Sequence, residues 1–95
     1  MGRGGMREIG RTAHYKKDLK RLAKSGRYDL DELEAIIQDL ANDLLLAEKH
    51  HDHALSGDWI DHRDCHIRPD WILIYRLEPG HLILVRTGSH AELLG

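Results

Sequence analysis

The spacing of hydrophobic residues along this 95-residue chain changes from a helical period in its first half to a strand period in its second half. Residues 13–25 and 29–44 repeat their apolar positions every three or four residues, which predicts two amphipathic helices. Short runs of strand-forming residues predict a sheet. Its strands span residues 7–11, 60–68, 70–78 and 81–89. These elements indicate an α+β fold, with both helices packed on one face of a small, four-stranded antiparallel sheet.

Capping residues set the limits of the two predicted helices. Thr12 and Gly26 are the expected N-cap and C-cap of the first helix. Asp29 precedes the second helix, and Glu32 stands three residues later, in a variant of the capping box. The residues expected to face the core are Tyr15, Leu19 and Leu22 in the first helix and Leu30, Leu33, Ile36, Ile37, Leu40 and Leu44 in the second.

Turn-forming residues predict how the strands connect. The histidine-rich segment 48–59 is broken by Gly and Ser, which indicates a loop. Pro79 and Gly80 occupy the central positions of a type II turn, so the last two strands form a predicted hairpin. Pro69 separates the two strands before it, where its missing N–H is tolerated.

Size and composition limit the class of protein. A chain of 10.9 kDa forms one domain with one modest core. Residues 1–5 predict a flexible leader, which leaves a single domain over residues 6–95. The longest apolar run, residues 71–75, is too short to span a membrane. The single cysteine, Cys65, excludes an intrachain disulfide and fits a reducing, cytoplasmic environment.

Charge is unevenly distributed, although the net charge of the chain is only −2. Residues 1–27 contain nine Lys and Arg against two acids, a surplus of +7. Residues 28–52 contain eight acids against one lysine. A basic first third can bind polyanions even in a slightly acidic protein, and the alternative is a solvated helix face.

Histidines are frequent, and several lie near the predicted sheet. The chain contains eight, and four of them are His50, His51 and His53 in the loop and His66 on a strand. Asp64 and His66 are two positions apart, so a strand places both on one face. Cys65 and Ile67 then point to the other face, into the core. The sheet can bring further polar residues to the Asp64 face, namely Asp70, Arg86 and His90.

Three interpretations of this polar set are open on the residues alone. His and Asp can ligate a metal, but their spacing matches neither H-E-x-x-H nor C-x-x-C. They also suit metal-independent cleavage of an RNA phosphodiester, in which histidines act as base and acid near neutral pH and an arginine stabilises charge on the phosphate. In the third interpretation they are solvated surface residues.

Several motifs of the C-terminal half resemble a known family. Leu55, Gly57 and Trp59 form a Leu-x-Gly-x-Trp motif, which is followed by RDCHIRPDWILIY and RTGSHAELLG. In this order the motifs resemble the YafQ family of bacterial toxins, within the RelE/ParE superfamily. The match is detailed over residues 50–95, whereas the two helices before it fit the family in outline. The resemblance implies a single RelE/ParE-like toxin domain over residues 6–95.

The resemblance also implies a function. It indicates a toxin of a type II toxin–antitoxin system, a ribosome-dependent endoribonuclease that cuts mRNA in the A site and is held silent by a cognate antitoxin. Cleavage is expected to be a transesterification that needs neither metal nor cofactor. The active-site positions of the family fall on His53, Asp64, His66, Asp70, Arg86 and His90.

Roles for these residues follow from the resemblance and from their places along the chain. We expect His90 to be the acid for the leaving oxygen and His66 to be the base, with His53 as the competing candidate. Asp70 is expected to orient a histidine or favour its charged form. Arg86 is expected to stabilise charge that builds on the phosphate.

Two other functions compete with the nuclease. One is a RelE/ParE-fold toxin that binds a target protein without cutting RNA, as the gyrase-directed branch of the superfamily does. Another is a metal-binding protein that uses the histidines of the loop together with His66. The titratable set favours the nuclease, because a pure binder does not need it. Leu94 departs from the aromatic residue that such toxins can carry near the C-terminus, so base stacking is not expected there.

Overall fold

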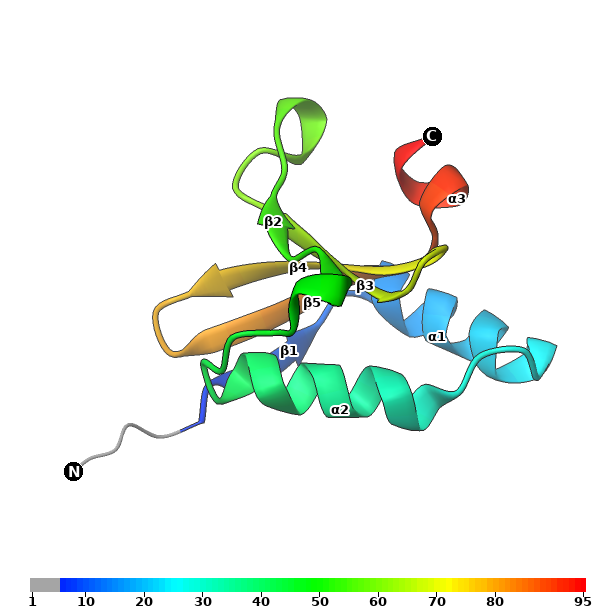
Figure 1. Cartoon of the computed structure of the whole chain (residues 1–95), viewed down its shortest axis with the longest axis horizontal. Coiled ribbons are helices and arrows are strands. Elements are labelled where there is room, and N and C mark those ends of the chain that lie inside the picture. The colour runs from blue at the N-terminus through cyan, green and yellow to red at the C-terminus, as the bar shows by residue number, and fades with distance from the viewer. Residues whose placement is uncertain (1–5) are drawn as a thin grey trace.

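A five-stranded sheet with two long helices against one face forms the frame of the protein (Figure 1). The computed structural model describes residues 6–95, so the leader predicted at residues 1–5 lies outside the described residues. The strands are β1 Glu8–Arg11, β2 His53–Ala54, β3 Arg63–Arg68, β4 Trp71–Glu78 and β5 His81–Ser89. The helices are α1 Ala13–Ser25, α2 Leu30–Ala41 and α3 His90–Leu94, with single-turn 3₁₀ helices at Glu48–His50 and Gly57–Trp59. The predicted α+β architecture is confirmed.

The sheet has the order β1-β5-β4-β3-β2. Strands β3, β4 and β5 are antiparallel neighbours, and Gly80 between the last two has a φ of +75°, as the predicted type II turn requires. The prediction of a purely antiparallel, four-stranded sheet is wrong in two respects. First, β1 runs parallel to β5. This pairing was not predicted, because two helices and three strands separate the two strands along the chain and no local pattern specifies their relative direction. Second, the two residues of β2, within the predicted loop, are too few to show a strand period.

The two long helices begin and end close to the predicted caps. Thr12 caps α1 with its hydroxyl, and Gly26 ends that helix with a φ of 72°. Asp29 caps α2 through its carboxylate. Glu32 does not complete the predicted capping box, because its carboxylate forms two hydrogen bonds of 2.7 and 2.8 Å with Arg68 of β3.

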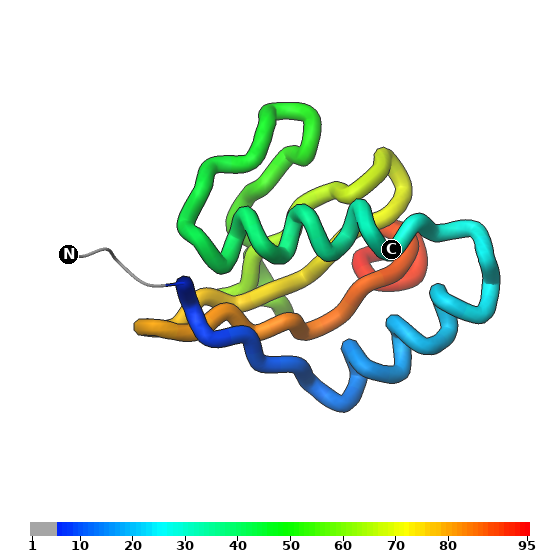
Figure 2. Tube along the Cα trace, turned by 90° about the horizontal axis from the view of Figure 1, so that it is seen from below, coloured from blue at the N-terminus to red at the C-terminus, as the bar shows by residue number. Residues whose placement is uncertain are grey.

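The core lies between the helices and the sheet. In the backbone trace α2 crosses over the strands of this face (Figure 2). It includes Tyr15, Leu22, Leu33, Ile36, Ile37 and Leu40 of the helices and Cys65, Ile67, Trp71, Leu73, Tyr75, Leu82 and Leu84 of the strands. The helix stripe is shorter than predicted. Leu44 lies beyond the end of α2 and is 56% exposed, because the helix stops at Ala41. None of the described helices is both long and apolar enough to cross a membrane.

The other face of the sheet carries two segments that rise above it, the β2 region and α3 (Figure 1). Cys65 and Ile67 belong to the core, as predicted, so the alternation of β3 turns Asp64 and His66 toward this other face. The sequence predicted that His90 lies just past the last strand, and it is the first residue of α3. The helix itself was not predicted, since five residues carry no periodic signal.

Candidate active site

Asp64 lies on β3, beside the edge strand β2, on the sheet face opposite the two long helices. It pairs with His53 of β2 on one side and with Ile74 of β4 on the other, and it is fully buried. His53 Nδ1 lies 3.2 Å from Asp64 Oδ1. Residues directly opposite each other in antiparallel strands have neighbouring side chains on the same face. The pairing of β2 with β3 therefore places a loop histidine beside the buried carboxylate.

Three histidines surround this carboxylate, and we call them the histidine cluster: His53, His66 and His90. All three lie close enough to act electrostatically on Asp64. The rings of His66 and His90 are 5.9 Å apart between centroids. The structure thus brings together four of the six residues that the sequence predicts for the site. These four come from β2, β3 and the start of α3.

Hydrogen bonds to backbone carbonyls define which ring nitrogens remain available. His66 Nδ1 lies 3.1 Å from the carbonyl oxygen of Pro69, and His53 Nδ1 lies 2.7 Å from that of His51. A carbonyl oxygen can only accept, so each Nδ1 carries the proton. In the neutral ring Nε2 then has the free lone pair. Both histidines can therefore accept a proton at Nε2.

A second polar network holds the loop that carries His53. The hydroxyl of Tyr75 donates a hydrogen bond to Asp52, and Arg63 Nε lies 3.4 Å from the same carboxylate oxygen. Asp52 is the residue before His53, so β4 and β3 fix the start of β2. His51 follows the 3₁₀ helix Glu48–His50, and its φ of 45° turns the chain toward β2. His51 also packs edge-on against His66, with 5.5 Å between ring centroids.

The Asp64 carboxylate has no hydrogen bond from any described residue, although it is buried. The proton on His53 Nδ1 is directed at the carbonyl of His51 instead. Burial raises the pKa of the Asp64 carboxyl above its ordinary value, and positive charge on the neighbouring histidines lowers it by less. A buried carboxylate without a donor destabilises a fold unless cations face it. Asp64 is therefore a buried carboxyl whose surroundings favour its neutral form.

This raised pKa predicts a pH dependence of stability. A carboxyl that binds its proton more tightly in the folded state stabilises the fold below its ordinary pKa of about 4, and that contribution is lost as the pH rises through the raised value. In Asp64→Asn this loss is expected to be absent from urea unfolding measured as the pH rises from about 4. Asp58→Asn, at an exposed acid, is the control and should keep the wild-type profile. Matching profiles for Asp64→Asn and wild type would contradict the assignment.

Asp70 does not place its side chain against a histidine. It lies exposed in the turn between β3 and β4, and no described residue hydrogen-bonds its carboxylate. Its backbone carbonyl accepts the N–H of His90 at 3.3 Å. The turn brings Asp70 next to α3 through the main chain. The backbone of Asp70 thus contacts the residue that begins α3, and a role of its side chain in orienting a histidine stays a prediction.

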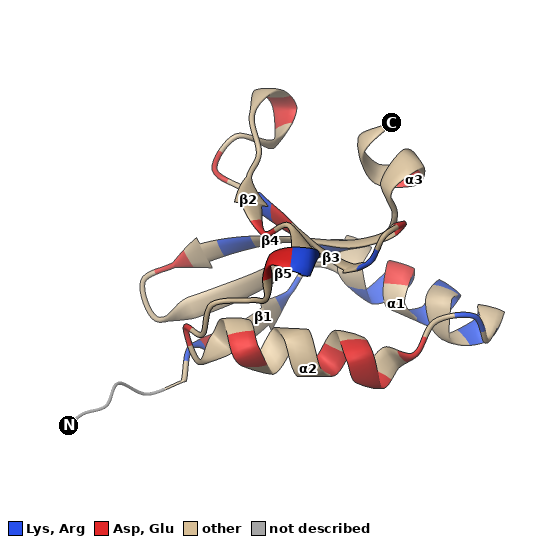
Figure 3. Ribbon diagram, in the orientation of Figure 1, with Lys and Arg blue, Asp and Glu red and all other residues tan. Residues whose placement is uncertain are grey.

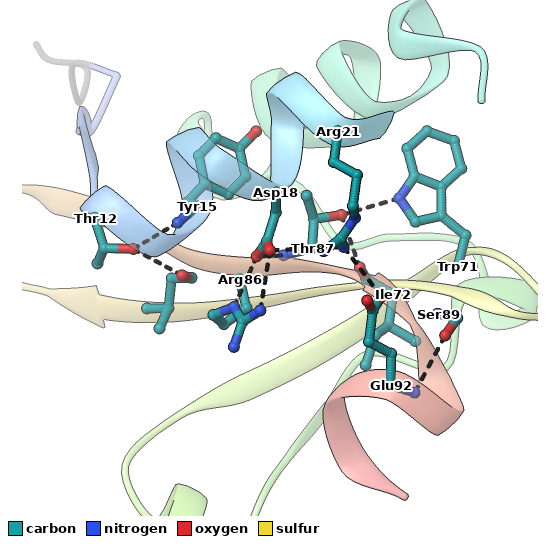
Figure 4. A network of polar contacts seen from close by, with 11 residues as sticks. Thr12, Tyr15, Asp18, Arg21, Trp71, Ile72, Arg86, Thr87, Ser89 and Glu92 are labelled. Atoms are coloured by element: carbon teal, nitrogen blue, oxygen red, sulfur yellow. Dashed lines mark hydrogen bonds and ion pairs between the residues drawn. The ribbon is translucent and has the colours of Figure 1, made fainter. Parts of the chain in front are cut away.

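Arg86 is held by a residue that the sequence interpretation did not include. Its guanidinium forms two hydrogen bonds, of 2.7 and 2.9 Å, with the carboxylate of Asp18 in α1, which also accepts the N–H of Thr87 at 3.2 Å (Figure 4). Asp18 is only 3% exposed. The hydrogen bond with Asp18 is the main cause that raises the pKa of Arg86, which stays charged. The edge of the guanidinium that faces away from Asp18 keeps N–H groups for another ligand.

A sequence signal for Asp18 existed. It is the one acid among residues 12–27, and it stands three positions after Tyr15 and four before Leu22. It therefore falls on the buried stripe of the helix. A buried acid needs a charged partner, and Arg86 is that partner.

Among residues 6–95, no group of three or more His, Cys, Asp or Glu side chains is arranged to hold a metal ion. His50, one of the loop histidines, directs its Nδ1 to the carbonyl of His66 at 2.6 Å, which removes that nitrogen from the site.

Comparisons with known proteins cover nearly the whole chain. The family model described as "Bacterial toxin of type II toxin-antitoxin system, YafQ" matches residues 7–95. The chain is 42% identical over 90 residues to the "mRNA interferase toxin YafQ" of Escherichia coli K12, and the match covers 94% of this chain and 97% of that protein.

Two solved toxin structures also match nearly the whole chain. A metal-bound toxin from Helicobacter pylori has a TM-score of 0.87 at 42% identity, over 94% of this chain and all of that one. The toxin in the DinJ–YafQ toxin–antitoxin complex of E. coli has a TM-score of 0.83 at 41% identity, over 96% of this chain and all of that one. The similarity therefore includes all the segments that carry the six predicted site residues.

Proposed function

The chain belongs to the YafQ family of bacterial toxins of type II toxin–antitoxin systems, and on this premise we propose that it is an mRNA interferase, an endoribonuclease that cuts mRNA on the ribosome. The observation that carries the proposal is the histidine cluster around the buried carboxylate of Asp64. Groups that exchange protons near neutral pH, placed on one surface, are what metal-independent RNA cleavage requires. The proposed cellular location is the cytoplasm, where mRNA is translated.

The proposed reaction is a transesterification within the RNA. A base removes the proton of a 2′-hydroxyl, and that oxygen attacks the adjacent phosphorus. Negative charge builds on the phosphate oxygens as the bond to the 5′-oxygen breaks, and an acid protonates the departing oxygen. The products are a 2′,3′-cyclic phosphate and a 5′-hydroxyl. The base, now protonated, and the acid, now deprotonated, return to their starting forms by proton exchange with water, so that no metal or cofactor is needed.

The geometry supports His66 as the base and His90 as the acid. Pro69 holds the Nδ1–H of His66, so its Nε2 is free to accept the 2′-hydroxyl proton. The His90 ring lies beside that of His66, with 5.9 Å between the two ring centroids. Asp64 lies close enough to both rings to interact with them electrostatically. His53, which lies nearest to Asp64, remains the alternative base.

Arg86 and the basic helix are proposed to bind phosphates. Arg86 projects from β5, and its outer N–H groups suit an anionic oxygen. The two long helices differ in charge, since α1 carries mainly basic residues and α2 carries acidic residues (Figure 3). The exposed cations of α1 include Lys16, Lys17, Lys20, Arg21 and Lys24. We propose that α1 faces ribosomal RNA or an acidic antitoxin segment.

The proposed function is tested by comparing cleavage of ribosome-bound mRNA with cleavage of the same mRNA in free solution. Purified toxin is expected to cut an mRNA held in programmed ribosomes, to leave the same mRNA intact in free solution, and to stop cutting when a cognate antitoxin is bound. Sequencing of the new 5′ ends measures both reactions. A matched preparation of His90→Ala serves as the control against contaminating nuclease, because magnesium cannot be removed from ribosomes. Equal cleavage of free and ribosome-bound mRNA, or no cleavage of either, would contradict the proposal.

A further inference from the structure

Helix α3 carries His90, yet little apolar packing fixes it. None of its five residues is fully buried. A helix of this length is not stable by itself. Its N-terminus is capped by the hydroxyl of Ser89, which accepts the N–H of Glu92 at 3.1 Å. Contacts from outside the helix must therefore fix the direction in which the His90 ring points.

One ion pair connects α3 to α1 across β5 (Figure 4). Arg21 Nη2 lies 3.1 Å from Glu92 Oε1, although the two residues are 71 positions apart. Arg21 Nη2 also lies 3.7 Å from Oδ1 of the buried Asp18. The helix that carries His90 is thus tied to the same part of α1 that holds Arg86.

The ion pair of Arg21 and Glu92 packs against Gly88 of β5, where a side chain would occupy the same space. A Cβ at this position would lie 2.7 Å from Glu92 Oε1 and 3.4 Å from Arg21 Nη2. The backbone at Gly88 does not have a positive φ, so its conformation does not require glycine. The atoms that a methyl group would displace are the flexible ends of the pair. An alanine at Gly88 is therefore expected to separate Arg21 from Glu92 with little disturbance of the strand.

We propose that Arg21 and Glu92 are positioning residues, which hold α3 so that His90 faces His66. The inference rests on the proposed nuclease function of His90. The carboxylate of Glu92 accepts a hydrogen bond from Arg21, and among the described residues none joins it to the histidine cluster, so its effect on His90 is expected to pass through the helix. The effect of removing Glu92 distinguishes a positioning role from a purely electrostatic one. An acid that acted on RNA only through its charge would weaken RNA binding, and its removal would strengthen it. Loss of a positioning residue slows the cleavage step instead.

Single-turnover cleavage of mRNA in programmed ribosomes at saturating toxin tests this sign. Glu92→Ala and Gly88→Ala are each expected to cut about three- to fivefold more slowly, equivalent to about 0.6–1 kcal/mol. The toxin concentration for half-maximal rate should not rise. Gly88→Ala should add no further loss to Glu92→Ala, because both break one pair. Glu78→Ala is the matched control, since Arg76 and Glu78 form an equally exposed pair of 2.8 Å at the far end of β4.

Hydrogen exchange of the His90 amide tests the positioning without ribosomes. This N–H bonds the carbonyl of Asp70, so Glu92→Ala and Gly88→Ala should speed its exchange about three- to fivefold, while Glu78→Ala should not. Wild-type cleavage by Glu92→Ala, or slower cleavage without faster His90 exchange, would overturn the proposal. Failure of the wild-type toxin to cleave would overturn the proposed function instead, and the exchange rates would still decide whether the pair fixes α3.

Discussion

Replacing His90 with alanine is expected to reduce single-turnover cleavage of ribosome-bound mRNA by about 10²- to 10⁴-fold, the usual loss when a general acid or base is removed. His90 is half-buried at the start of α3, so the variant should fold normally and keep its affinity for the antitoxin within a few fold. Growth of a bacterium that expresses the variant without antitoxin should recover in parallel. His66→Ala is expected to lose cleavage to a similar extent.

His14→Ala and His81→Ala are the controls for this loss. His14 is exposed on α1, and His81 begins β5 at the end of the sheet remote from α3. Neither belongs to the histidine cluster, so both variants should cut mRNA at the wild-type rate. A His90→Ala variant that cleaves ribosome-bound mRNA at the wild-type single-turnover rate would show that this histidine is not the acid.

Replacing Asp18 with asparagine is expected to lower the free energy of unfolding by about 3 kcal/mol. The variant keeps the size of the side chain but turns an amide toward the guanidinium of Arg86, which loses its counter-charge. About a quarter of the Arg86 side chain is exposed, at 26%, so water compensates in part. The change in stability should appear as a fall in melting temperature of roughly 10–20 °C.

Asp43→Asn is the matched control for Asp18. Asp43 also accepts a 2.7 Å bond from an arginine, Arg7, but its side chain is 61% exposed. An exposed pair contributes at most about 1 kcal/mol, and asparagine tolerates the positive φ of 59° at this position. Equal losses of stability from Asp18→Asn and Asp43→Asn, measured by urea unfolding, would contradict a special role of the buried carboxylate.

The parts of the fold that were predictable have strong local signals. Thr12, Gly26 and Asp29 mark helix ends through their own side chains or backbone conformation, and Gly80 marks the hairpin. Strand alternation placed Asp64 and His66 on one face because side chains in a strand alternate over two residues. The parallel pairing of β1 with β5 was not predictable in this way, since nothing within residues 8–11 specifies a partner more than 70 residues away.

Within the candidate site too, only the residues with a local sequence signal were predictable. Asp64 and His66 are neighbours in one strand, whereas the contact of His53 with Asp64 depends on a two-residue strand that shows no pattern. The ion pair between Asp18 and Arg86 joins residues 68 positions apart, and composition alone does not identify such partners. For Asp70 the motif located the turn correctly, but the direction of its side chain depends on packing that the motif does not describe.

The chemical nature of the cleaved ends tests whether the histidine cluster is a nuclease active site that works by transesterification. An mRNA bound to programmed ribosomes is cut with wild-type toxin, and the new termini are identified by their reactivity with polynucleotide kinase and RNA ligase. We expect a 2′,3′-cyclic phosphate on the upstream fragment and a 5′-hydroxyl on the downstream fragment, both absent with His90→Ala. A 3′-hydroxyl with a 5′-phosphate, or the same ends formed equally well by His90→Ala, would contradict this assignment.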